Sequence, residues 1–231
     1  MRRSDIIALR ISLLIIIIVN IEMMGEYVSE GELGSNPNTT FGLNGELQDH
    51  LASENTQVMV ELSRELKTSY SIPSLALHIA SRFFHKRSYL SYDRFLILAA
   101  CYLLASKIKN MDCRVKNLCN ALHSVIARKT MSVEPFNEEK MKRLKEHISI
   151  YETEVLRTLE FQIDSATPHD FLRRDCELLF SGDRETSKRI HTTVRVIILD
   201  SYRCRCCLVF SPLVIFLACF LIACRYEGRK P

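Results

Sequence analysis

The stretch ILAACYLLASK, residues 97–107, is apolar on every side of a helix and ends on a lysine. A helix of this kind must be buried, either in a large protein core or in lipid. Crossing a bilayer takes about 20 apolar residues. The apolar run here covers only residues 95–108 and already includes Ser106 and Lys107. Its length therefore favours a helix at the centre of a helical bundle.

Amphipathic segments that could surround this helix lie on both sides of it. Apolar residues recur every three or four positions in the segments 52–67, 71–87, 112–129 and 137–161. This spacing is typical of helices with one buried face. We therefore predict a five-helix bundle over residues 51–165. Residues 25–50, rich in glycine and asparagine, are predicted to be a flexible leader.

A second copy of the apolar stretch lies further along the chain, at an offset of 118 residues (215 − 97). IFLACFLIACR, residues 215–225, is identical to ILAACYLLASK at five of the eleven positions. Arg225 corresponds to Lys107. Such an offset is typical of an internal repeat, and helices predicted over 167–183 and 184–203 precede the copy. We therefore predict a second, C-terminally truncated bundle over residues 166–231. Exposed apolar surface is expected where its last two helices are missing.

The composition of the 231 residues argues against several functional classes. A net charge of +4 is too small to indicate nucleic-acid binding by itself. The sequence contains neither H-E-x-x-H nor a glycine-rich phosphate loop, so we expect no catalytic residue. Cys204 and Cys207 have C-x-x-C spacing but lack the second ligand pair that zinc requires. We therefore expect free cysteines, no metal site and no cofactor.

Two stretches keep a membrane protein open as an alternative. Residues 1–24 contain a short apolar run, Leu13 to Val19, and resemble a signal or anchor segment, or else an extension upstream of the native start. Cys206 to Cys224 carries no charge and is long enough to span, although Pro212 indicates a helix start inside it.

Two successive bundles, each with a buried helix ending in A-x-K or A-x-R, resemble the cyclin fold. RFFHKRSYLSYDRFLILAACYLLASKI, residues 82–108, resembles the core of a cyclin box. YETEVLRTLEFQIDSATPHDFL, residues 151–172, resembles the fifth helix and the linker after it. The TPH motif at 167–169 is similar to that of the transcription-associated cyclins T, K and L. The resemblance covers residues 51 to about 225 and implies an all-α, cyclin-like fold.

The resemblance also implies a partner, because cyclins bind a protein kinase and position its regulatory helix. Matching the motifs to this sequence implies that two charged residues contact the kinase: Lys107 at the end of the third helix and Glu152 early in the fifth. Glu154 is the nearby competitor of Glu152. The same match implies that the apolar part of the kinase-binding surface consists of Leu104, Ile108, Leu156, Phe161 and Ile163.

We therefore expect a nuclear regulatory subunit that forms a heterodimer with a cyclin-dependent kinase acting in RNA polymerase II transcription. A cell-cycle cyclin and a membrane-anchored helical protein are the alternatives, and the resemblance implies no direct nucleic-acid contact. One departure bears on which kinase is accepted. Ile108, Lys109 and Asn110 stand where family members usually carry acidic residues after the lysine.

Overall fold

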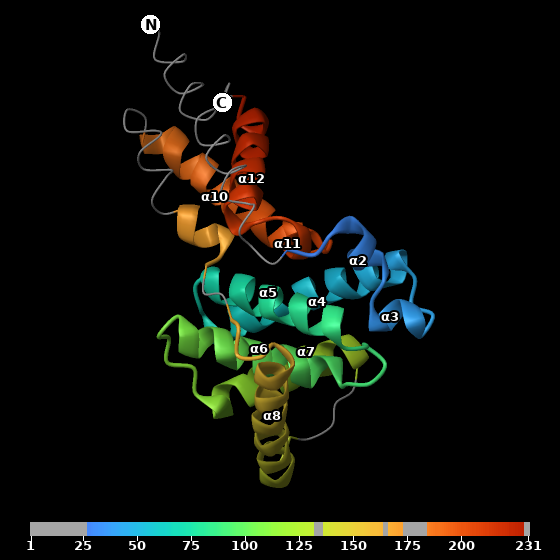
Figure 1. Ribbon diagram of the computed structural model, residues 1–231. Coiled ribbons are helices and arrows are strands. Elements are labelled where there is room, and N and C mark those ends of the chain that lie inside the picture. The colour runs from blue at the N-terminus through green and yellow to red at the C-terminus, as the bar shows by residue number, and fades with distance from the viewer. Residues whose placement is uncertain (1–26, 132–135, 164–165, 173–183, 229–231) are drawn as a thin grey trace, which may run out of the picture.

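The computed structural model describes residues 27–131, 136–163, 166–172 and 184–228, and every regular element within them is a helix. The all-α prediction is confirmed. Five of these helices form the predicted first bundle (Figure 1). They are α4 (Gly45–Leu66), α5 (Ser71–Lys86), α6 (Arg94–Ile108), α7 (Val115–Thr130) and α8 (Glu138–Thr158).

Helix α6 is the buried axis of this bundle. Asp93 caps it by accepting from the backbone N–H groups of Phe95 and Leu96, which satisfies two donors that the first turn leaves free. Every residue from Ile97 to Ser106 is buried, because α4, α5, α7 and α8 all pack against α6. Among the helices that the structure describes, none is both long enough and apolar enough to cross a membrane. The run from Leu13 to Val19 lies outside the described residues.

Residues 27–50 are folded, so the prediction of a flexible leader over 25–50 is wrong for the part that the structure describes. Helices α2 (Glu30–Gly34) and α3 (Pro37–Thr40) both begin with a capping box, and α4 begins at Gly45 instead of near Leu51. Asparagine and serine are common in loops, yet the same side chains cap helices. Composition alone therefore does not separate the two cases.

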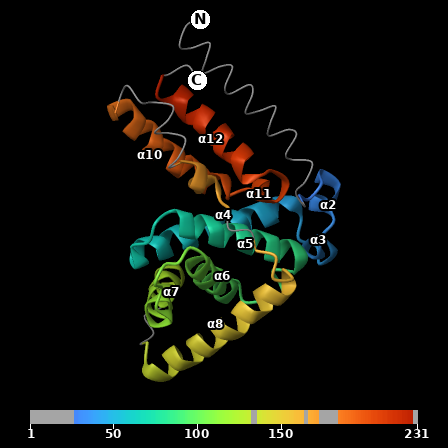
Figure 2. The same ribbon diagram turned by 60° about the vertical axis from the view of Figure 1, so that its left-hand side comes forward.

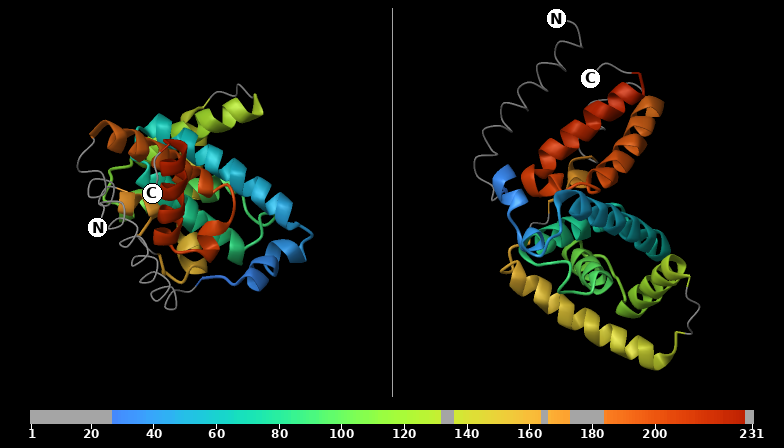
Figure 3. Two further views of the ribbon diagram at one scale, coloured as in Figure 1. Left: turned by 90° about the horizontal axis from the view of Figure 1, so that it is seen from above. Right: turned by 90° about the vertical axis from the view of Figure 1, so that its right-hand side faces the viewer.

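The helices of residues 184–228 are compatible with the predicted second bundle. Helices α10 (Arg184–Ser201) and α12 (Pro212–Tyr226) pack against each other, and the short α11 (Cys206–Val209) lies between them in sequence. Figures 2 and 3 show these helices on one side of α4 and α5, with α8 on the other side. Residues 168–172 are helical, but most of the predicted helix over 167–183 lies outside the described residues.

The repeat offset of 118 residues holds at both ends of the two apolar helices. Helix α6 begins at Arg94 and α12 at Pro212, while their last residues also differ by 118 (226 − 108). Their surroundings differ, because Leu104 of α6 is 5% exposed and its counterpart Ile222 of α12 is 54% exposed. Equivalent positions of the two apolar helices are therefore buried in α6 and exposed in α12.

This difference in exposure predicts that the same substitution at the two equivalent positions has unequal effects on the free energy of unfolding. Leu104→Gln is expected to lower the free energy of unfolding by about 2–4 kcal/mol, because it buries an amide without partners. Ile222→Gln is expected to change it by less than about 0.5 kcal/mol. Urea denaturation of the two variants measures both values. Similar losses in both variants would contradict the exposure of Ile222.

His169 lies where the linker between the bundles meets α10. The residue is 8% exposed, its ring stacks on Tyr70 with centroids 6.2 Å apart, and its Nε2 lies 3.3 Å from the backbone oxygen of Arg195. Burial lowers the pKa of His169 from 6.5 to about 4. The unfolded chain therefore binds the proton more readily, so the stability that neutral His169 contributes above pH 6.5 is lost as the pH falls towards 4.

This pKa difference predicts an acid-sensitive contribution to stability. Between pH 7 and pH 4.5 the wild type is expected to lose about 2 kcal/mol more unfolding free energy than His169→Gln, which has no imidazole to protonate. Denaturation curves at the two pH values measure the difference. An identical pH dependence in both proteins would show that His169 is not held neutral.

Candidate functional site

The C-terminal end of α6 meets α8 at a charged pair. Nζ of Lys107 donates to Oε1 of Glu152 across the two helices. Lys107 lies in the last turn of α6, where a positive charge interacts favourably with the helix dipole. The Lys107 side chain is 58% exposed and that of Glu152 15%. The structure thus brings the two predicted charged residues together and leaves the lysine open to solvent.

Glu154, the competitor of Glu152, has other partners. The hydroxyl of Tyr92 donates to its Oε1 at 2.9 Å, and Nη2 of Arg87 lies 4.0 Å from the same oxygen. Partial burial, together with this contact, raises the pKa of Tyr92. The carboxylate that meets Lys107 is therefore that of Glu152.

The apolar residues assigned to the same surface differ in exposure. Phe161 is 70% exposed. Ile108, Leu156 and Ile163 are half-buried and pack against the core. Leu104 is only 5% exposed, so it contributes little to this surface. We call the charged pair and the remaining apolar residues the α6–α8 surface: Lys107, Ile108, Glu152, Leu156, Phe161 and Ile163.

A tight turn after α8 presents Phe161. Glu160 and Phe161 have φ angles of 54° and 59°, a region that non-glycine residues seldom adopt. The backbone N–H of Phe161 donates to the oxygen of Leu156 at 2.9 Å, and Nη1 of Arg82 on α5 donates to the oxygen of Gln162 at 2.7 Å. The exposed ring therefore lies on a backbone that is held in place. The sequence offers no glycine or asparagine that would have indicated this turn.

The sequence did not predict the ion pair that Lys109 forms with Asp170. Its Nζ donates to both carboxylate oxygens of Asp170, at 2.9 and 2.8 Å. Asp170 also accepts from the backbone N–H and the hydroxyl of Thr167 at 2.7 and 2.8 Å. Lys109, one of the residues found where acidic side chains were expected, therefore connects the end of α6 to the linker that contains the TPH motif.

The cysteines of the described part mostly behave as buried thiols. Cys101, Cys119, Cys207, Cys219 and Cys224 are free and buried, whereas Cys176 lies outside the described residues. Over those same residues, no group of three or more His, Cys, Asp and Glu side chains is arranged to hold a metal ion.

The sequence model of a family described as "Cyclin, N-terminal domain" matches residues 26–164. The chain belongs to the cyclin family. The matched range starts before α2 and ends after the turn that carries Phe161. It therefore includes both the folded residues before α4 and the whole α6–α8 surface.

Individual relatives agree with the predicted resemblance to transcription-associated cyclins. Cyclin-T of Drosophila melanogaster is 21% identical over 87% of this chain and 17% of its own length. Cyclin-K and Cyclin-T2 of Homo sapiens are each 20% identical, over 88% and 87% of this chain and 34% and 27% of their own lengths. The chain thus spans about a sixth to a third of the length of these relatives.

A solved structure supports the cyclin fold. A chain in the crystal structure of the yeast RNA Pol II CTD kinase CTDK-1 complex superposes with a TM-score of 0.69 at 14% identity. The superposition covers 90% of this chain and 64% of that one. The predicted cyclin-like fold is therefore confirmed.

Proposed function

We propose that this chain is a regulatory subunit that binds and activates a cyclin-dependent kinase, and that the kinase acts in RNA polymerase II transcription. The observation that carries the proposal is the pairing of Lys107 with Glu152 on the α6–α8 surface. The likeness to Cyclin-T and Cyclin-K, and to a chain of a Pol II CTD kinase complex, supports the transcriptional assignment. The role is regulatory, its place is the nucleus, and the kinase supplies the catalytic residues.

The geometry of the α6–α8 surface suits this role. The exposed ammonium group of Lys107 has donors left for backbone carbonyl groups of a partner, and Glu152 can accept from partner N–H groups. Charged groups surrounded by apolar side chains at an interface fix its register and its specificity. Because Glu152 already orients Lys107 in the free chain, little side-chain entropy is lost when the partner binds.

Co-expression with a panel of cyclin-dependent kinases tests the proposal. Affinity purification of the full chain is expected to recover a heterodimer with a kinase of the transcription-associated group. That heterodimer is expected to phosphorylate a peptide from the C-terminal domain of RNA polymerase II faster than the kinase alone. Recovery of no kinase would refute the proposal. Recovery of a cell-cycle kinase alone would replace the transcriptional role with a cell-cycle role.

A further inference from the structure

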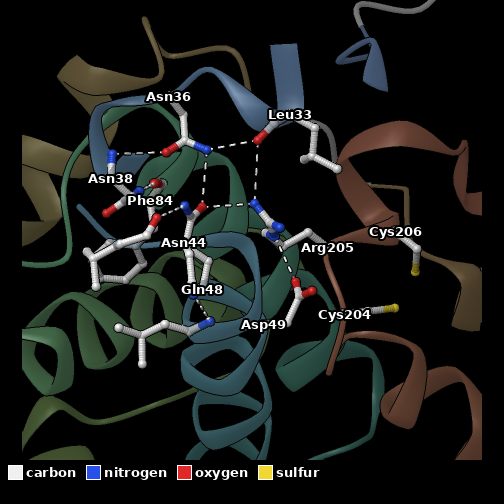
Figure 4. A network of polar contacts seen from close by, with 12 residues as sticks. Leu33, Asn36, Asn38, Asn44, Gln48, Asp49, Phe84, Cys204, Arg205 and Cys206 are labelled. Atoms are coloured by element: carbon white, nitrogen blue, oxygen red, sulfur yellow. Dashed lines mark hydrogen bonds and ion pairs between the residues drawn. The ribbon is translucent and has the colours of Figure 1, made fainter. Parts of the chain in front are cut away.

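Two thiols converge on one backbone oxygen between α10 and α11. Sγ of Cys204 donates to the oxygen of Ser201 at 3.2 Å, and Sγ of Cys206 donates to the same oxygen at 3.1 Å. Figure 4 shows the two cysteine side chains near each other, with the guanidinium group of Arg205 pointing away from them.

Cys204 differs from the other free thiols of the described residues in its exposure and in the direction of its pKa shift. Cys204 is exposed and Cys206 is half-buried. The neighbouring Cys206 thiol holds the pKa of Cys204 below its usual range, while Cys204 and burial raise the pKa of Cys206. Burial raises the pKa of Cys119 and Cys224 to about 11 and that of Cys207 to about 12. An accessible thiolate beside a second thiol is the arrangement found in redox-sensing cysteines.

We propose that Cys204 and Cys206 form a reversible oxidation site that takes a hydroperoxide and yields a Cys204–Cys206 disulfide. The Cys204 thiolate attacks the peroxide, so that an S–O bond forms, the O–O bond breaks, and the leaving oxygen takes up a proton. The Cys206 thiol then attacks the resulting sulfenic acid, forming the S–S bond and releasing water. The two thiols lose two electrons and two protons, and a thiol reductant restores them by disulfide exchange.

Oxidation at this site would act on the contact between the two bundles. Arg205 lies between the two cysteines in the chain and is 16% exposed. Its Nε donates to Oδ1 of Asp49 and its Nη1 to Oε1 of Gln48, both at 2.8 Å (Figure 4). A disulfide between Cys204 and Cys206 changes the backbone conformation of Arg205, which lies between them. The disulfide therefore pulls Arg205 from α4 and loosens the attachment of α11 to the first bundle.

Peptide mapping of the full chain tests the disulfide, because trypsin cleaves after Arg203 and Arg205 and so separates the two cysteines. The reduced protein is treated with hydrogen peroxide, blocked with an alkylating agent and digested. The expected product is the dipeptide of residues 204–205 joined to the peptide that begins at Cys206, with a loss of two hydrogen atoms. Cys204→Ser is expected to abolish this product, and the matched control Cys207→Ser is expected to keep it.

The Cys206→Ser variant is expected to stop at the first step, which a diketone probe for sulfenic acid detects at Cys204. Oxidation of the wild type is also expected to lower the midpoint of thermal unfolding, with no such shift in Cys204→Ser. The oxidation site is overturned if the joined peptide is absent from the wild type or is lost in Cys207→Ser. An unchanged midpoint after complete disulfide formation would overturn the coupling through Arg205.

Discussion

Replacing Lys107 with glutamate is expected to weaken binding to the kinase partner by roughly 30- to 1000-fold, which corresponds to a loss of about 2–4 kcal/mol. The substitution removes the ammonium donor and places a second carboxylate beside Glu152. The unbound chain is expected to lose little unfolding free energy, because an ion pair with so exposed a lysine contributes only about 0–1 kcal/mol to stability. Isothermal titration calorimetry with the kinase identified by co-expression measures the change.

A matched control is available on α8. Arg143 pairs with Glu139 one turn away, and both side chains are 69% exposed. Arg143→Glu therefore makes the same charge reversal on α8, outside the α6–α8 surface, and we expect the affinity of this variant for the kinase to equal that of the wild type. An affinity of Lys107→Glu equal to that of this control would remove Lys107 from the interface.

The second large effect is expected at Asn38 in α3. This side chain is fully buried, donates to the oxygen of Phe84 at 2.6 Å and accepts from the backbone N–H of Tyr89 at 2.8 Å. Asn38→Leu leaves both backbone groups buried without a partner, so the free energy of unfolding is expected to fall by about 2–5 kcal/mol. Denaturant unfolding followed by circular dichroism measures this loss.

The control for Asn38 lies on the same short helix. Thr40 is exposed, and its hydroxyl makes only a 3.4 Å contact to the oxygen of Asn36. Thr40→Ala is expected to change the free energy of unfolding by less than about 0.5 kcal/mol. If Asn38→Leu were as stable as Thr40→Ala, α2 and α3 would not be part of the folded domain.

The features that could be predicted were those with a local signal. The apolarity of α6 and its copy at an offset of 118 residues both hold in the structure. The fifth amphipathic segment was predicted to begin at residue 137, and the side chain of Asn137 caps α8 by accepting from the backbone N–H of Lys140 at 2.9 Å. Such signals lie within a few residues of the feature they produce, so a single sequence is enough to show them.

The features that were missed depend on contacts distant in sequence. The sequence around Asn38 gives no sign that its side chain donates to the oxygen of Phe84, 46 residues away. Lys107 and Glu152 are 45 residues apart in sequence, and no periodicity links them. Only the resemblance to cyclins predicted that they lie on one surface. The turn at Phe161 and the burial of Leu104 follow from packing against α5 and α8.

The most direct test of the kinase-binding account is the double variant Lys107→Glu with Glu152→Lys. This variant restores an ion pair between α6 and α8 with its charges exchanged, so the midpoint of thermal unfolding is expected to match that of the wild type. A partner that contacts both side chains meets the wrong charge at each position, so binding to the kinase is expected to stay as weak as in Lys107→Glu. Wild-type affinity in the double variant would show that the pair only joins α6 to α8, and would contradict a direct contact with the kinase.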